Sequence, residues 1–336
     1  MYDSIPDADD DAAELAWVVD AAWHGQRLDK ALAVWMPQWS RAYLSRLIAD
    51  GAVDVDAVPC SRAATKLKVG QQVAMQWRAP AAAMPATPQP VAFEVVHQDA
   101  ALCVVNKPAG LVVHPAAGNW QGTLLNGLLH RDPAAAELPR AGIVHRLDKD
   151  TTGLMVVARS RLAMESLTRQ LAQRSVSRDY VALAHGSATP GQRLTLEGWI
   201  GRDPRQRLRM AVWDHAAPGA RPAKTHAICV GSAAGQSLWA CKLHTGRTHQ
   251  IRVHMRHAGH PLVGDALYGG KTLLGMQRQA LHAVQLQLLH PTSGELMTWH
   301  APVPQDLMHA LAELGLDYNA PTTPIAHEYP RHQTHN

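Results

Sequence analysis

The sequence has few of the residues that cross-link a chain or bind metals. It contains four cysteines among 336 residues, and no two of them form a CxxC pair. Cys60, Cys103, Cys229 and Cys241 are scattered, so neither a disulfide framework nor a zinc site is predicted. The 20 histidines include no HExxH or similar ligand pattern, and we therefore expect no metal site.

Long apolar runs and a basic N-terminus are also absent. No apolar run approaches the ~18 residues that a membrane span requires. The chain begins with an acidic stretch where a signal peptide would be basic. We therefore expect a soluble, cytoplasmic protein with no membrane partner. With 46% hydrophobic residues over 336 positions, the chain can bury a sizeable core and form two domains.

The charge is distributed unevenly along the chain. Residues 1–14 hold six acidic side chains and no lysine or arginine, which leaves 32 basic against 22 acidic residues in the rest. A surplus of +10 suits a polyanionic partner, although many basic proteins bind no nucleic acid. Residues 1–14 have too little apolar surface to offset the entropy of ordering, and we predict a disordered lead. Residues 318–336, a mixture of Pro, Thr and His, are predicted to be a disordered tail.

Two helices and short strands are predicted in the N-terminal part. Apolar residues recur at helical spacing from Leu28 until Pro37, and a second helix is predicted between Ser40 as N-cap and Gly51 as C-terminal cap. Alternation predicts short strands at Val53–Val55, Leu67–Val69 and Val73–Met75. Basic residues lie on the polar sides of these elements, namely Arg27, Arg41, Arg46, Lys66 and Lys68. They form either an RNA phosphate-binding face or an ordinary solvated surface.

A proline-rich stretch separates this part from the rest. Four prolines among small residues predict an extended, semi-rigid linker at 79–90. The predicted domains are therefore residues 15–78 and residues 91–317. The second domain is expected to begin with strands at Phe93–Val96 and Leu102–Val105, followed by a turn at 106–110.

A charged stretch between two apolar runs is the candidate reactive site. It reads GIVHRLDKDTTGLMVVARS from Gly142 to Ser160. The runs Ile143–Val144 and Leu154–Ala158 are predicted to be buried strands, and the charged residues between them form the connection. Because a loop held by rigid strands can position a reactive side chain, Asp148 is the candidate. The alternative is a salt-bridged surface hairpin with no chemistry.

Two further segments contribute candidates. In the predicted strand around Tyr180, this tyrosine shares one face with Val176, Arg178, Ala182 and Ala184, and it is either a core tyrosine or a site residue. Farther on, Thr248 is predicted to cap a helix whose polar face carries Arg252. From its pattern alone, Arg252 contacts either phosphate or solvent.

The motifs HRLDKDTTGLMVVA and GRTHQIRVHM, with the (K/R).Y.A pattern around Tyr180, resemble those of the RluA family of RNA pseudouridine synthases. The resemblance implies that Asp148 is the catalytic residue, that the Tyr180 ring lies on the target base, and that Arg252 is the buried ion-pair partner of Asp148. It also implies substrate-binding roles for three more residues. These are Arg146, which fills the space of the flipped base or holds its phosphate, Arg247, which contacts RNA, and Leu281, which walls the base pocket.

The resemblance also predicts the fold and the partner. The segment GQRLDKALAVWMPQWSRAYLSRLIADGAVDV is similar to the S4 RNA-binding fold, except that Asp56 and Ala57 replace an Asn-Gly type of turn. We therefore expect an α+β protein. It would have a small S4-like RNA-binding domain and a pseudouridine synthase domain with a mixed, mostly antiparallel sheet and flanking helices. The protein is expected to be a monomer that needs no cofactor.

Within the family, the motifs are most similar to enzymes that modify three uridines in the 23S rRNA stem-loop that meets the small subunit. The expected partner is 23S rRNA or a large-subunit precursor. A sister subfamily with other 23S uridines is the alternative. A non-catalytic RNA-binding assembly factor and a base-excising glycosylase remain as other classes. Whether the carboxylate attacks C1′ or removes a ribose proton is left open by the sequence. Either role needs a guanidinium nearby, because a carboxylate tends to protonate in a pocket without water.

Overall fold

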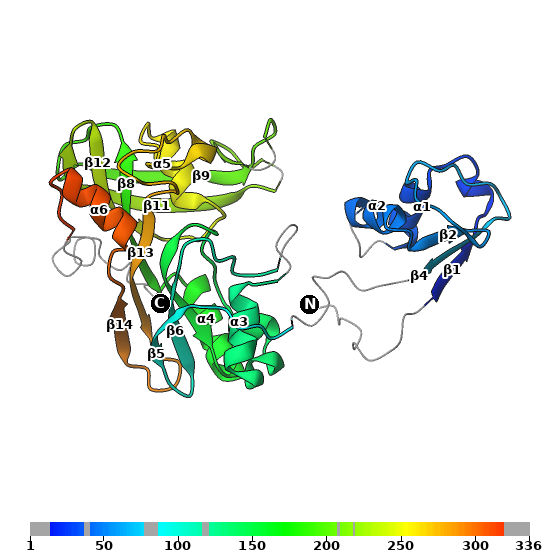
Figure 1. Cartoon of the computed structure of the whole chain (residues 1–336), viewed down its shortest axis with the longest axis horizontal. Helices are drawn as coiled ribbons and strands as arrows, with labels where there is room; N and C mark the ends of the chain where they lie inside the picture. The colour runs from blue at the N-terminus through cyan, green and yellow to red at the C-terminus, as the bar shows by residue number, and fades with distance from the viewer. Residues whose placement is uncertain are drawn as a thin grey trace, which may run out of the picture. The chain divides into compact units, whose positions relative to one another are not determined.

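A computed structural model describes residues 14–36, 41–76, 87–115, 121–206, 209–217 and 219–318 of the chain. The chain divides into two compact units at residues 85 and 86 (Figure 1). This division falls within the range predicted as a linker, of which residues 79–86 lie outside the described part. The predicted lead up to residue 13 and the predicted tail from residue 319 also lie outside it.

The first unit is a four-stranded antiparallel sheet with two helices. Its elements are β1 (Glu14–Val18), the 3-10 turn η1 (Ala21–Trp23), α1 (Leu28–Trp35), α2 (Arg41–Ala49), β2 (Val53–Val55), β3 (Val58–Pro59) and β4 (Gln72–Gln76). The strands lie in the order β1-β4-β2-β3. Leu28 and Leu32 of α1 and Leu44 and Ile48 of α2 are fully buried against the sheet, as their helical spacing predicts.

Several predictions for this unit can be compared with the structure. Gly51 follows α2 with φ +75°, which confirms the predicted cap, whereas Pro37 and Ser40 lie outside the described residues. The predicted strand at 67–69 is wrong, because Leu67 is a core residue next to a single bridge between Lys66 and Arg27.

The turn between β2 and β3 keeps its backbone conformation despite an unusual sequence. Asp56 and Ala57 both have positive φ, at 54° and 61°, as a tight hairpin turn requires. The Asp56 carboxylate accepts hydrogen bonds from Gln72 N and from Gln71 Nε2, both at 2.8 Å. These bonds tie the turn to the start of β4.

The second unit is built on a ten-stranded mixed sheet. Its strands are β5 (Glu94–Gln98), β6 (Leu102–Lys107), β7 (Thr152–Ala158), β8 (Ser177–His185), β9 (Arg193–Arg202), β10 (Met210–Trp213), β11 (Arg221–Ala233), β12 (Gln236–Leu243), β13 (Leu281–Leu289) and β14 (Leu296–His300). The order is β10-β9-β11-β12-β8-β13-β7-β6-β5, with β14 also paired to β13. Only the pairing of β7 with β13 is parallel, so the sheet is mixed and mostly antiparallel, as expected.

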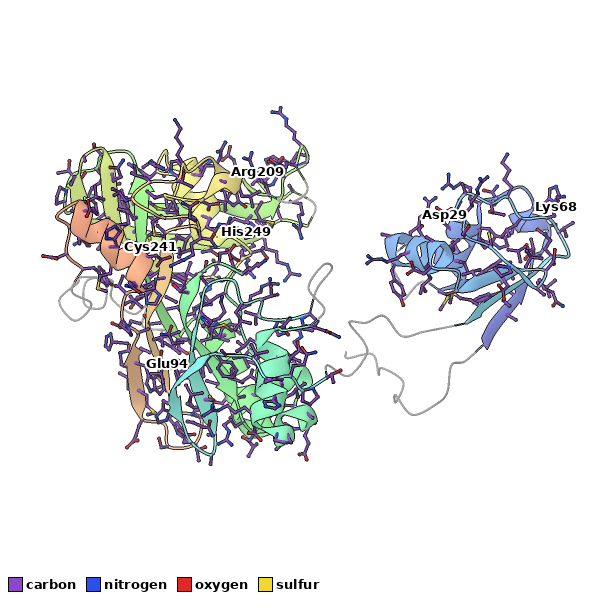
Figure 2. The ribbon with its side chains drawn as sticks, viewed as in Figure 1. Asp29, Lys68, Glu94, Arg209, Cys241 and His249 are labelled. Carbon is purple, nitrogen blue, oxygen red and sulfur yellow. The ribbon has the colours of Figure 1, made fainter. Side chains whose placement is uncertain are left out.

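Helices cover both faces of this sheet (Figure 1). They are α3 (Leu124–Arg131), α4 (Arg161–Ala172), α5 (Gln250–His257) and α6 (Gln305–Glu313), with 3-10 turns η2 (Pro133–Glu137), η3 (Pro139–Gly142) and η4 (Ala266–Tyr268). α3 and α5 share a core with one face of β8 and β12, and that core contains Cys241, labelled in Figure 2. α4 and α6 pack in separate clusters against residues of the opposite strand faces. None of the described helices is long and apolar enough to cross a membrane.

Two local predictions for the second unit are wrong. Ile143 makes one isolated bridge to Val157 of β7, and no strand forms at 143–144, because the chain turns from this bridge into the charged loop. Thr248 is not the cap of α5. The residue before that helix is His249, with φ 57°, and the Gln250 side chain instead accepts the Arg247 amide at 3.0 Å. By contrast, Ser160 caps α4 as predicted, with its Oγ accepting the Ala163 amide at 3.2 Å.

Candidate active site

A buried lysine fixes one side of the charged loop. Lys107, at the end of β6, has no exposed surface, and its Nζ donates to the carbonyl oxygens of Pro108, Leu111 and Lys149 at 2.8 to 2.9 Å. Burial lowers the pKa of Lys107 to about 7, while Asp150 has the opposite effect. Since a neutral amine has only two N–H groups, the protonated form alone fills all three bonds.

Other bonds hold the opposite side of the loop. Arg278 Nη1 donates to the Asp150 carbonyl at 3.0 Å, and Gln279 Nε2 donates to Thr151 Oγ1 at 3.1 Å. The Thr151 amide also closes a turn onto the Asp148 carbonyl at 3.2 Å. The backbone that carries Asp148 is therefore fixed by contacts from sequence-distant segments.

A close approach of two strands brings two candidate residues, Tyr180 and Leu281, together. Gly153 has φ +113°, and a Cβ there would lie 2.2 Å from the Ala283 carbonyl oxygen, so only glycine allows β7 and β13 to pair at this point. On its other side β13 pairs with β8, where Ala283 faces Tyr180 across the strands. The same pairing places Leu281 opposite Ala182, two residues along β8 from Tyr180.

The decisive contact is an ion-pair cluster of one arginine and two aspartates. Arg252 of α5 is 6% exposed, and its Nη1 lies 3.1 Å from Asp148 Oδ2. Its Nε and Nη2 bind both carboxylate oxygens of Asp265, at 2.7 and 2.8 Å. The bidentate bond to the fully buried Asp265 orients the guanidinium, and this leaves one N–H edge for Asp148.

Neighbouring rings complete the support of Arg252. Its Cζ lies 5.1 Å from the centroid of the Tyr268 ring, and the Tyr268 hydroxyl is 2.9 Å from His249 Nδ1. Burial acts to lower the pKa of Arg252, but the bonds to Asp265 and Asp148 raise it above its ordinary value. Arg252 therefore stays charged within the protein.

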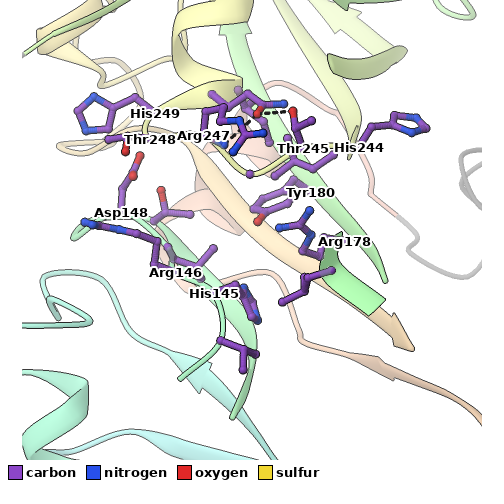
Figure 3. A pocket seen from close by; sticks show the side chains of 18 of the residues that line it. His145, Arg146, Asp148, Arg178, Tyr180, His244, Thr245, Arg247, Thr248 and His249 are labelled. Carbon is purple, nitrogen blue, oxygen red and sulfur yellow. Dashed lines mark hydrogen bonds between the residues drawn. The ribbon is translucent and has the colours of Figure 1, made fainter. Parts of the chain in front are cut away.

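Asp148, His249 and Arg252 line a cavity of about 690 Å³ (Figure 3). Asp148 is the single carboxylate among its lining residues, and six arginines surround it. The arginines are Arg140, Arg146, Arg174, Arg178, Arg247 and Arg252. A cavity with this surplus of positive charge suits an anionic ligand. One part of that ligand would lie against the Asp148 carboxylate.

Tyr180 and Leu281 form an apolar part of the cavity wall. Both are 4% exposed, and both belong to the core cluster that extends to Ile251 and Met255 of α5. Burial raises the pKa of Tyr180 to about 12, so its hydroxyl stays protonated at neutral pH. The two side chains offer a rigid aromatic and aliphatic surface beside Asp148.

The structure brings together all six candidates predicted for the second domain. Asp148, Tyr180, Arg252, Arg146, Arg247 and Leu281 each line the cavity. The basic candidates of the first unit differ among themselves. Arg27 and Arg41 both bind the buried carboxylate of Asp29, whereas Arg46, Lys66 and Lys68 are exposed and form no salt bridge with a described residue.

Two residues of the site were missed in the sequence. Asp265 follows the helix motif within the same segment, and the five donors of a buried arginine were the signal that a second carboxylate was needed. Arg178 was placed on the face of Tyr180 but given no role, although it lines the same cavity. Among the described residues no group of three or more His, Cys, Asp or Glu side chains could hold a metal ion.

Comparison with known proteins agrees with this geometry. Residues 101–257 match the RNA pseudouridylate synthase family. The chain is 48% identical over 305 residues to a ribosomal large subunit pseudouridine synthase D of Neisseria meningitidis serogroup B, covering 87% of this chain and 80% of that protein. It is 43% identical over 317 residues to the protein of the same name from Yersinia pestis, covering 90% and 95%. The chain belongs to the RNA pseudouridylate synthase family.

The fold of this synthase also has a solved counterpart. Human RNA pseudouridylate synthase domain containing 4 is 25% identical, with a TM-score of 0.53, over 67% of this chain and 94% of that one. Together with the sequence relatives, this likeness confirms the family and the mixed-sheet catalytic domain that the motifs predicted. The synthase is an RNA-modifying isomerase whose cavity places one carboxylate among cationic and apolar walls.

Proposed function

We propose that this synthase converts specific uridines of 23S rRNA to pseudouridine, with Asp148 as the catalytic residue. The observation that supports this most directly is the contact of Asp148 with Arg252 in a cavity that holds no other carboxylate. The relatives named as large-subunit synthase D support the choice of 23S rRNA.

The reaction needs one carboxylate beside the sugar. The bond between uracil N1 and ribose C1′ breaks, the uracil turns without leaving, and C5 bonds to C1′ while its proton is lost and N1 gains one. Asp148 either attacks C1′ and is released again or removes a ribose proton. The product has the mass of the substrate, so the overall change requires neither an oxidant nor a group donor.

The surrounding side chains divide the remaining work. Arg252 orients Asp148 through its Nη1 contact, and Tyr180 and Leu281 hold the uracil that has left its stack. Arg146 is exposed at the cavity and adjoins this loop, so it fills the vacated space or binds a phosphate. Arg247 contacts the RNA backbone nearby.

The first unit adds affinity for structured RNA. We propose that it is the S4-like RNA-binding domain, with Arg46, Lys66 and Lys68 as phosphate contacts and Arg27 and Arg41 beside them. These contacts supply affinity without sequence choice. Target choice then comes from RNA shape and from splayed loop bases at the cavity. We propose as targets the three uridines of the stem-loop that meets the small subunit, and the sister subfamily's uridines are the alternative.

Release of tritium from 23S rRNA labelled at uridine C5 tests the proposal. Wild-type protein is expected to release one tritium per uridine modified, with no change in RNA mass and no free uracil. Free uracil would identify a glycosylase, and RNA binding with no release would identify a binding factor. Mapping pseudouridines in rRNA from a strain without this gene then tells the three stem-loop uridines from those of the sister subfamily.

A further inference from the structure

Arg178 is a buried cation without a partner among the residues that the structure describes. It lies in β8 two residues before Tyr180 and is 9% exposed. Its guanidinium makes no hydrogen bond or ion pair with any described residue, and its Nε is completely covered. Burial lowers the pKa of Arg178, and no carboxylate acts against this effect. A buried charge in this state is costly unless a ligand completes it.

His145 supplies a second unsatisfied donor in the same part of the cavity. Its Nε2 accepts the Val156 amide at 3.0 Å, so the proton of the neutral ring must be on Nδ1. Burial, and after it the charge of Arg178, lower the pKa of His145 to about 3, which keeps the ring neutral. His145 Nδ1 is buried and has no hydrogen-bond partner among the described residues.

The wall around Arg178 is shaped to leave room for it. A Cβ at Gly246 would lie 2.8 Å from Arg178 Nη1, so the backbone of residue 246 closely approaches the end of the guanidinium, and a larger residue there would displace it. Arg174 and Arg247 line the same cavity, and burial together with the charges of Arg221, Arg174 and Arg178 lowers the pKa of Arg247. Figure 3 shows Arg178 between Tyr180 and His145, on the opposite side of Tyr180 from His249.

We propose that Arg178, with His145 Nδ1, binds a backbone phosphate of the RNA next to the nucleotide whose base lies on Tyr180. Both groups are donors that no described acceptor satisfies, and a phosphate presents the negative acceptor oxygens that they lack. A neutral uracil carbonyl would accept a bond from Arg178 but would leave its charge uncompensated. Because Arg178 lies two residues before Tyr180 in β8, it would fix the RNA backbone at a set distance from the base that lies on Tyr180. The proposal rests on the proposed function, because it assigns the phosphate to the substrate of that site.

The stability of the free protein distinguishes this role from a structural one. If Arg178 is held ready for a ligand, Arg178→Met removes an unpaired buried charge and the melting temperature stays the same or rises. If Arg178 instead supports the fold, the melting temperature falls, and that result overturns the proposal. Arg178→Lys is the second variant, since it keeps the charge and is expected to keep part of the RNA affinity.

Binding to a chemically modified RNA tests the contact itself. A set of stem-loops is prepared, each with an uncharged methylphosphonate in place of one phosphate that flanks the target uridine. Each RNA is titrated with Asp148→Asn protein, which is expected to bind without turnover, and with the double variant that also carries Arg178→Met. We expect one methylphosphonate to weaken binding to the first protein about 10- to 100-fold and to leave binding to the second unchanged.

Equal losses in both proteins at every position would overturn the phosphate assignment and favour a contact to the base. Failure of the proposed function would be recognised separately, because wild-type protein would then release no tritium from the unmodified stem-loop. Gly246→Ala is an independent check. It pushes on the Arg178 guanidinium without removing a charge, and it is expected to weaken binding of unmodified RNA while having little effect on methylphosphonate RNA.

Discussion

The two units each contain a buried cluster of aspartate and arginine, but in opposite ratios. In the first unit, the carboxylate of Asp29 accepts bonds at 2.8 to 3.2 Å from both Arg27 and Arg41, whose side chains are 50% and 53% exposed. In the second, the single Arg252 binds both Asp265 and Asp148. The first cluster, with two arginines and one aspartate, has a net positive charge at the surface. The second cluster taken alone, with one arginine and two aspartates, has a net negative charge, although the cavity that it adjoins is lined by more arginines than carboxylates.

The ratio of arginine to aspartate determines which charged groups in each cluster remain available for other contacts. Burial acts to raise the pKa of Asp29, but bonds from its two arginines bring it below its ordinary value, and both guanidinium groups keep donors free for solvent or phosphate. In the second unit, Asp265 satisfies and orients most of the guanidinium. Asp148 therefore has one N–H contact from Arg252 and remains open to the cavity, as its proposed catalytic role requires.

A third aspartate shows what burial does without arginine. Asp179 is 5% exposed on β8, accepts a bond from Ser177 Oγ and forms no salt bridge with a described residue. Burial raises the pKa of Asp179 to about 6, although Lys242 acts to lower it. The contrast with Asp29, whose pKa is lowered by Arg27 and Arg41, indicates that the arginines oppose the effect of burial there.

The largest expected effect comes from removing the open carboxylate. Asp148→Asn should bind RNA but lose turnover at least about 10⁴-fold, because the reacting oxygen at C1′ is lost. Single-turnover tritium release measures the rate, and filter binding measures the affinity. Asp150→Asn, two residues along the same loop, is the matched control and should remain active. Turnover by Asp148→Asn at the wild-type rate would remove Asp148 from the mechanism.

The next effect should follow from breaking the orienting pair. Asp265→Asn leaves Arg252 with one carboxylate, and we expect a loss of about 3 kcal/mol in the free energy of unfolding together with a ~10²-fold slower turnover. Urea denaturation and tritium release measure the two quantities. A variant with wild-type stability and rate would show that Asp148 alone positions Arg252.

The comparison with Asp179 is tested by pH. Between about pH 4 and 6 the folded protein keeps the Asp179 proton that the unfolded chain has released, so the stability from this group is complete below pH 4 and is lost as pH rises through 6. Asp179→Asn should therefore be more stable than wild type at pH 7.5, by about 3 kcal/mol, and equal to it near pH 3.5. Denaturation curves across this range measure the difference.

The same substitution at the exposed Asp317 is the control for this experiment and should leave the free energy of unfolding unchanged. If the difference in the free energy of unfolding between Asp179→Asn and wild type does not change with pH, Asp179 is ionised in the folded protein. Its partner would then have to be a group outside those described here.

The smallest effect concerns the cations of the first unit that have no carboxylate partner. Replacing Lys66 and Lys68 together by glutamine should reduce the slope of log affinity against log salt by about 1.4 to 1.8 and weaken RNA binding about tenfold at moderate salt. The melting temperature should not change, since both side chains are exposed. Lys271→Gln, exposed and outside the cavity lining, is the control. An unchanged slope would remove these two lysines from the RNA surface.

The sequence by itself determined the secondary structure wherever one local rule decides it. The apolar spacing of α1 and α2, the Ser160 cap of α4 and the alternation that places Tyr180 with Ala182 and Ala184 on one face of β8 are confirmed. These features depend on neighbours a few residues apart, and the chain displays them directly. The placement of Val176 on that face is wrong, because Val176 precedes β8 and packs in another core cluster. The motifs also indicated the Asp148 and Arg252 pair, but only through resemblance, since 104 residues separate the two in the chain.

Only the tertiary structure decided how the charges are shared. The bidentate bond of Asp265 to Arg252, the three carbonyls around Lys107 and the unpartnered guanidinium of Arg178 all join segments that no local pattern connects. The same reason explains the errors at 143–144 and at Thr248, where contacts with distant strands and with the Gln250 side chain replaced the local preference. A side chain's role in this site depends on how many partners surround it, and the fold alone brings those partners together.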